Sequence, residues 1–146
     1  MAYQIQLKGE FRHEEAEAAG IIKPGMLIEL LTAGTVQAHS TRGGFAERAF
    51  AVEDALQGHT IDNSYAVADL VTYHLVVPGG EVMALIQAGC VVTVGEQLIS
   101  GADGTLIPIG DIGSHDTLRQ VVAVATEAID LSDSGDDDAL CEVRVL

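Results

Sequence analysis

The sequence contains no tryptophan and few large aromatic or basic side chains. Its 146 residues include three Phe, three Tyr and three Pro, and seven Lys or Arg stand against 22 Asp or Glu. The formal charge of −15 disfavours binding to nucleic acid or to an anionic membrane, because both need a basic patch and the basic residues are scattered. Apolar residues still make up 48% of the chain, which excludes wholesale disorder and predicts one domain with a core of small aliphatic side chains.

Cysteine is also scarce, and no targeting segment is recognisable. Cys90 and Cys141 form no CxxC motif or zinc-type spacing, and both lie in apolar stretches. We therefore expect buried free thiols, while the spacing leaves a disulfide between them open. The first residues lack the basic region and apolar run of a secretory signal, and no stretch reaches the ~18 apolar residues of a membrane span. Synthesis and assembly in a cytoplasm are expected.

Glycine, in contrast, is abundant, and its 16 positions separate short segments that alternate or are rich in β-branched residues. This pattern predicts an all-β fold, a small β-sandwich or β-barrel of short antiparallel strands with at most one short helix. Hairpins are predicted for residues 26–31 with 35–39, 70–77 with 81–86, and 97–100 with 105–108. Single strands are predicted for residues 120–129 and 141–145, and an acidic loop for 132–138. Residues 12–19 have the composition of a short helix, with a loop as the alternative.

The N-terminal segment alternates, with Tyr3, Ile5 and Leu7 on one face of an extended strand. Residues 1–10 are accordingly predicted to form an N-terminal arm or edge strand, and residues 11–146 a single β-rich domain. The alternation fits equally an arm that pairs with another chain and the first strand of the domain's own sheet.

No arrangement of residues in the sequence predicts catalysis, a cofactor or a metal. The five histidines show no pair at the spacings that aim two imidazoles at one ion, and no phosphate-binding loop, nucleophile elbow or dinucleotide motif occurs. The acidic loop lacks the ligand spacing of an EF-hand, so it is interpreted as solvated. The alternative is a small β-barrel enzyme or metal-binding protein. It would bring at least two of His39, His59, His74 and His115 together in a concave pocket.

Six segments framed by glycines and turns resemble the bacteriophage head decoration proteins, also called capsid cement proteins. They are residues 20–29, 48–58, 61–69, 78–85, 88–106 and 122–132. The resemblance covers residues 20–146 and rests on turn framing, without a chemical motif. It implies a compact β-barrel or β-sandwich in which residues 45–53 are extended, although their Ala and Glu content also fits a helix. It further implies a homotrimer on the outer capsid surface of the virion, assembled in the bacterial host cytoplasm. Such a protein binds the major capsid protein, stabilises the head and catalyses nothing.

In related decoration proteins the N-terminal segment often contacts the capsid. By that resemblance the predicted capsid-binding residues are Ala2, Tyr3, Gln4, Ile5, Gln6 and Leu7, which precede the resembling region. A different virion part, such as a connector or tail-tube subunit, is the remaining alternative, and it would form rings in place of trimers.

Overall fold

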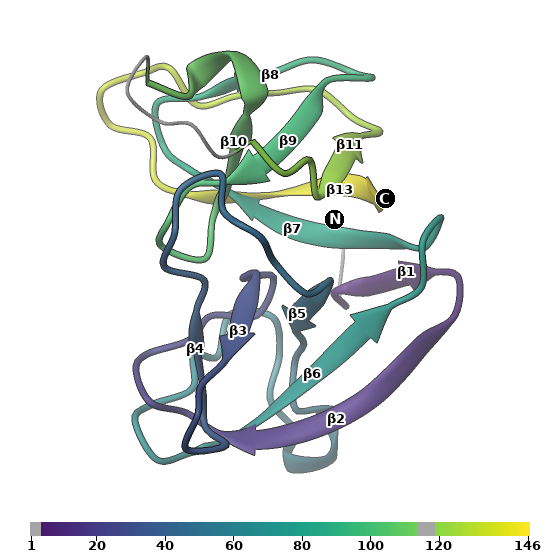
Figure 1. Cartoon of the computed structure of the whole chain (residues 1–146), viewed down its shortest axis with the longest axis vertical. Coiled ribbons are helices and arrows are strands. Elements are labelled where there is room, and N and C mark those ends of the chain that lie inside the picture. Colours follow the sequence, from purple (N-terminus) through teal and green to yellow (C-terminus); the bar gives the residue numbers. More distant parts are fainter. Residues whose placement is uncertain (1–3, 114–118) are drawn as a thin grey trace.

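The computed structural model describes residues 4–113 and 119–146, and it is all-β with no α-helix in those ranges (Figure 1). Two 3-10 turns, η1 (Ala55–Gln57) and η2 (Ile109–Asp111), accompany the strands. The strands are β1 (Gln6–Lys8), β2 (Phe11–Glu17), β3 (Ile28–Leu30), β4 (Val36–Ala38), β5 (Ala49–Ala51), β6 (Leu70–Val76), β7 (Glu81–Ile86), β8 (Val91–Val92), β9 (Gln97–Ser100), β10 (Leu106–Pro108), β11 (Ala123–Ala125), β12 (Ile129–Asp130) and β13 (Ala139–Val145). The predicted fold class is confirmed. Among the described residues, no helix is long and apolar enough to cross a membrane.

A five-stranded barrel forms the upper part of the molecule in Figure 1. Its strands follow the order β7, β10, β9, β11 and β13, and the pairing of β13 with β7 closes the ring. β1 pairs with the beginning of β7, while β10 pairs in parallel with its end at Ile86. The aliphatic side chains that point inward form the larger core and are fully buried, Ile5, Leu98 and Val143 among them.

A second layer of strands lies below the barrel (Figure 1). β2, β6 and β5 form an antiparallel sheet in that order, and the hairpin of β3 with β4 packs against one face of it. Ile28, Val36, Val71 and Tyr73 belong to the small core between them. The other face of the sheet points toward the N-terminal segment, and this face carries the candidate site.

The helix or loop predicted for residues 12–19 is wrong, because most of this segment is strand β2. β2 pairs with β6 over its whole length, from Phe11 opposite Val76 to Glu17 opposite Leu70. Helix propensity in eight residues is worth little by itself, and the ladder with the strongly β-forming β6 outweighs it.

The hairpin predicted between residues 70–77 and 81–86 is also wrong, although both strands exist. β6 pairs with β2 and β5, whereas β7 pairs with β1, β10 and β13. Between them the chain passes from one sheet to the other at Gly79 and Gly80, where Gly79 N donates to Val145 O of the barrel and Val145 N donates to Gly80 O. The turn at residues 78–80 therefore joins two layers.

The other two predicted hairpins are confirmed, as β3 with β4 and as β9 with β10. The predicted terminal strand is β13, residues 45–53 are extended around β5, and residues 132–138 form a loop. The strand predicted for residues 120–129 divides into β11 and β12, because β11 joins the barrel while β12 pairs with β8. Cys90 and Cys141 are buried free thiols, as expected.

Candidate functional site

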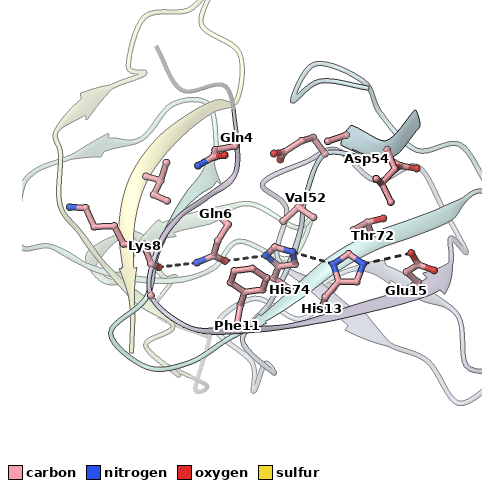
Figure 2. Close-up of a pocket in the computed structure, with 15 residues that line it drawn as sticks. Gln4, Gln6, Lys8, Phe11, His13, Glu15, Val52, Asp54, Thr72 and His74 are labelled. Atoms are coloured by element: carbon pink, nitrogen blue, oxygen red, sulfur yellow. Dashed lines mark hydrogen bonds and ion pairs between the residues drawn. The ribbon is translucent and has the colours of Figure 1, made fainter. Parts of the chain in front are cut away.

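A groove of about 470 Å³ separates the N-terminal segment from the sheet of β2, β6 and β5. Gln4, Gln6 and Leu7 line one wall, and Val52 to Leu56 line the other. The floor consists of side chains from β2 and β6, which include His13 and His74 (Figure 2). The groove thus combines the predicted arm with residues that the sequence analysis had not grouped with it.

The register of β2 and β6 explains why the two histidines meet. His13 lies directly opposite His74, and side chains opposite each other in an antiparallel pair point to the same face. The neighbouring pairs, Arg12 with Leu75 and Glu14 with Tyr73, point to the opposite face. The pairing of two strands far apart in the sequence therefore creates the histidine pair.

A chain of polar contacts runs across the floor (Figure 2). Gln6 Nε2 donates to the Lys8 carbonyl at 2.9 Å, so its Oε1 accepts from His74 Nδ1 at 3.2 Å. His74 Nε2 is then the acceptor for His13 Nδ1 at 3.4 Å, and His13 Nε2 lies 3.6 Å from Glu15 Oε1. His74 thus donates through Nδ1 and accepts through Nε2, so its imidazole is the Nδ1–H tautomer.

His74 is held neutral in this position. The Phe11 ring stacks on its imidazole with centroids 3.9 Å apart and planes 7° from parallel. Burial, followed by the adjacent His13, lowers the pKa of His74 from 6.5 to about 4. An uncharged, hydrogen-bonded imidazole stacked on a phenyl ring joins the N-terminal segment to the sheet, and it is poorly suited to accept a proton near neutral pH.

Carboxylates dominate the charge of the groove. Glu53 Oε2 accepts a hydrogen bond from the Ile5 backbone N–H at 3.0 Å, and Asp54 lies beside it in the same wall. The opposing cation, Lys8, lies 3.1 Å from Glu81 Oε2, so Glu81 largely neutralises it. Beside these charges stand apolar surfaces, with Phe11 45% and Leu56 93% exposed.

The structure divides the six predicted capsid-binding residues. Gln4, Gln6 and Leu7 line the groove, while Ile5 is fully buried in the barrel core. Ala2 and Tyr3 lie outside the described residues. Only part of this segment is therefore available to a partner, and whether it touches a capsid stays a prediction.

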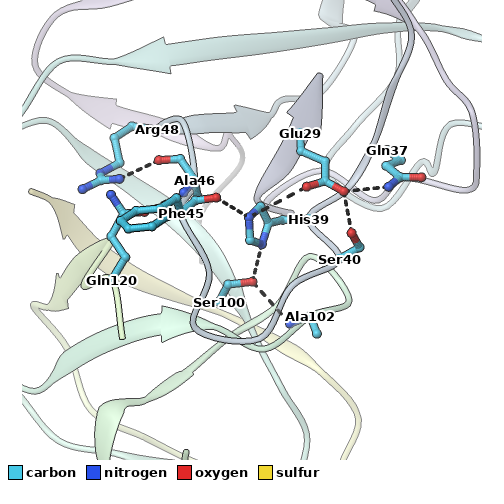
Figure 3. Close-up of polar contacts among 10 residues, drawn as sticks. All are labelled: Glu29, Gln37, His39, Ser40, Phe45, Ala46, Arg48, Ser100, Ala102 and Gln120. Atoms are coloured by element: carbon cyan, nitrogen blue, oxygen red, sulfur yellow. Dashed lines mark hydrogen bonds and ion pairs between the residues drawn. The ribbon is translucent and has the colours of Figure 1, made fainter. Parts of the chain in front are cut away.

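A second polar cluster surrounds His39 and has the composition of a Ser–His–acid triad (Figure 3). His39 Nε2 donates to the Phe45 carbonyl at 2.9 Å, so its Nδ1 accepts from Ser100 Oγ at 2.6 Å. His39 and Ser100 are 1% and 0% exposed, and Glu29 Oε2 lies 3.9 Å from His39. A nucleophile must reach its substrate, and this serine cannot. The cluster fixes the loop of Phe45 to β9.

Of the four histidines named for a metal-binding alternative, the three that the structure describes do not converge. His39 and His74 lie in separate clusters, His59 is exposed beyond η1, and His115 falls outside the described residues. Within residues 4–113 and 119–146, no group of three or more His, Cys, Asp or Glu side chains could hold a metal ion. The pair that does form joins His74 to His13. No local sequence motif predicts this histidine pair, because it depends on the register between β2 and β6.

Comparison with known proteins yields a structural likeness. No family model matches the sequence, and no curated protein matches it. Among solved structures, the fold is similar to the N-terminal base of head fibre gp8.5 in bacteriophage phi29. The TM-score is 0.58 at 14% sequence identity, over 94% of this chain and 95% of that chain. At this identity the likeness establishes a shared fold.

Proposed function

We propose that the chain is a structural, non-enzymatic protein of a bacteriophage head. It binds the outer capsid surface as a homotrimer, contacts the major capsid protein and stabilises the head in the manner of a cement protein. The observation that carries this proposal is the fold likeness to a phage head fibre base, which spans 94% of this chain. Fold alone does not determine function, so the surface must also suit the role.

The polar clusters support a structural role. Both histidine clusters have mutually satisfied hydrogen bonds, and each holds one segment of the chain against another. The buried Ser100 hydroxyl and the neutral His74 lack the access and the basicity that nucleophilic or general base catalysis requires.

Exposed apolar side chains support self-association. Large aliphatic or aromatic residues that are more than half exposed occur on several loops and strands: Ile21, Leu30, Phe45, Leu56, Val67, Leu70 and Val94. Neighbouring copies and a shell would cover such surface. Trimerisation also makes attachment multivalent, and linked contacts raise avidity by ~10² to 10⁴ even where each contact is weak.

Two measurements test the proposal. Light scattering should give a mass near three times the 15.3 kDa of one chain, whereas a connector or tail-tube subunit would give larger rings. The protein should also co-sediment with capsids assembled from the major capsid protein of the same genome. A strict monomer at micromolar concentration that stays in the supernatant would refute the proposal.

The predicted arm can be tested without removing Ile5 from the core. Gln4 is exposed and Leu7 half-buried, so the double variant Gln4→Lys, Leu7→Lys alters the accessible side chains of the segment. We expect weaker capsid co-sedimentation. Gln97→Lys, at an exposed position at the start of β9, is the matched control. Unchanged binding of the double variant would show that the segment is not the anchor.

A further inference from the structure

β2 presents an unpaired backbone edge. The pairs that flank it are hydrogen-bonded, since Val77 N donates to Glu10 O at 3.0 Å and Ala18 N donates to Asp69 O at 2.8 Å. Hydrogen-bonded pairs alternate with non-bonded pairs along an antiparallel ladder. The backbone N–H and C=O groups that point away from β6 are therefore those of Phe11, His13, Glu15 and Glu17.

This edge differs from the opposite edge of the same sheet. Beyond β5, Ala51 N donates to Met26 O and Gly25 N donates to Ala51 O, so that edge is covered. Beyond β2, the pairing in the described part of the chain is limited to a bridge between Ala18 and Val36 of β4, where Ala19 N donates to Val36 O at 2.8 Å. The stretch of β2 from Phe11 to Glu15 thus leaves an open ladder, which is a ready template for another strand.

The same four residues direct their side chains to the groove. Backbone direction and side-chain face both alternate with a period of two, and three of the four (Phe11, His13 and Glu15) line the groove. A strand added to β2 would therefore lie along the rim of the groove, beside Glu15. Its side chains would meet carboxylates together with the exposed ring of Phe11.

The charge of β2 selects the partner. Glu15 and Glu17 lie on the groove face of β2, whereas Arg12 and Glu14 lie on the opposite face and offset each other, with Arg12 Nε 2.6 Å from Glu14 Oε1. Two copies of this strand would repel each other, because like charges opposite one another destabilise a ladder. An extended segment rich in Lys or Arg would gain both backbone bonds and charge complementarity.

We infer that the open edge of β2 and the adjoining groove accept an extended cationic segment of the capsid by strand addition. This inference rests on the proposed function and names the surface that performs it. The partner segment donates to and accepts from the outward backbone positions of Phe11, His13 and Glu15, and a basic side chain lies over Phe11 with its charge toward Glu15.

Hydrogen exchange reads the backbone contact directly. In the free protein, the amides of Arg12, Glu14 and Ala16 should exchange slowly because they bond to β6, and those of Phe11, His13 and Glu15 should exchange fast. With a peptide of alternating valine and arginine as the probe, the fast set should become protected. A peptide of alternating valine and glutamate should leave it fast. Continued fast exchange at saturating arginine peptide would overturn the inference.

Variants on β2 separate the edge from the rest of the surface. Glu15→Pro removes an outward N–H that β6 does not use, so the fold should tolerate it while capsid binding weakens at least about tenfold. Glu15→Lys keeps the backbone and should weaken binding in a salt-dependent way. Glu14→Lys makes the same charge change on the opposite face, beside Tyr73, and should change affinity less than about threefold.

The outcomes distinguish the two proposals. Wild-type protein that binds capsids, together with Glu15 variants that bind equally well, would refute the strand-addition site and leave the proposed function standing. Wild-type protein that binds no capsid would refute the proposed function, whatever the variants do. If Glu15→Pro unfolds, as circular dichroism would reveal, Glu15→Lys and the exchange measurement still decide.

Discussion

Replacing Ile5 by alanine tests whether the N-terminal segment contributes to the stability of the domain. Ile5 is fully buried in the barrel core, and its backbone N–H donates to Glu53 Oε2. An Ile→Ala change in a well-packed core costs roughly 2–5 kcal/mol, since it removes apolar contact and leaves a cavity. We expect a loss of about 3 kcal/mol in the free energy of unfolding, which lowers the Tm of a domain of this size by roughly 6–12 °C.

Urea denaturation followed by circular dichroism measures this loss, and thermal melting provides a second reading. Leu7→Ala is the matched control, because Leu7 is half-buried at the groove wall and should cost about 1 kcal/mol or less. A loss below about 1 kcal/mol for Ile5→Ala would refute the reasoning. The segment would then behave as a loose arm whose contacts with the barrel carry no weight.

Three further changes have defined outcomes. The pKa of His74 falls from 6.5 to about 4 on folding, so the unfolded chain binds more protons than the folded chain in that pH range. The free energy of unfolding should therefore be highest above pH 6.5 and should fall as the pH drops to 4. His74→Gln should remove roughly 2–3 kcal/mol of that fall, measured by urea titrations at several pH values. Ala102→Gly should raise the Tm slightly because Ala102 has φ +80°, whereas Gly104→Ala at φ +82° should lower it, since the new Cβ would meet Met26 and Ala38. Burial raises the pKa of Cys90 to about 11 and of Cys141 to about 12, so a thiol reagent at pH 8 should modify neither until denaturant is added, and rapid labelling of the native protein would contradict their placement.

Local signals predicted the parts of the fold that local chemistry controls. The β9–β10 hairpin follows from glycines at both ends of residues 101–104, and its turn backbone takes positive φ at Ala102 and Gly104. The β3–β4 hairpin turns at Gly34, which also has positive φ. In both cases the turn residues and the alternation of their flanking strands indicate the same pairing.

Partner choice between distant strands could not be predicted in this way. β6 and β7 are separated by a short turn, which favours a hairpin, yet each gains more by pairing elsewhere: β6 with the whole of β2, and β7 with six residues of β13. β2 has a helical composition, and only its partner makes it a strand. The candidate site depends on these choices, because the contact of His13 with His74 exists only once β2 and β6 are in register.

The ladders that build this molecule join residues far apart in the chain: His13 and His74 are 61 residues apart in sequence, and β7 and β13 have a similar separation. Each such ladder requires a long loop to close before any contact stabilises it, and domains of this kind fold in milliseconds to seconds. All five barrel strands lie between residues 81 and 145, whereas β1 and Ile5, which add to the edge and the core of the barrel, come from the other end of the chain. We therefore expect a fragment of residues 77–146 to be markedly less stable than the whole chain, and to gain stability when a fragment of residues 1–76 is added.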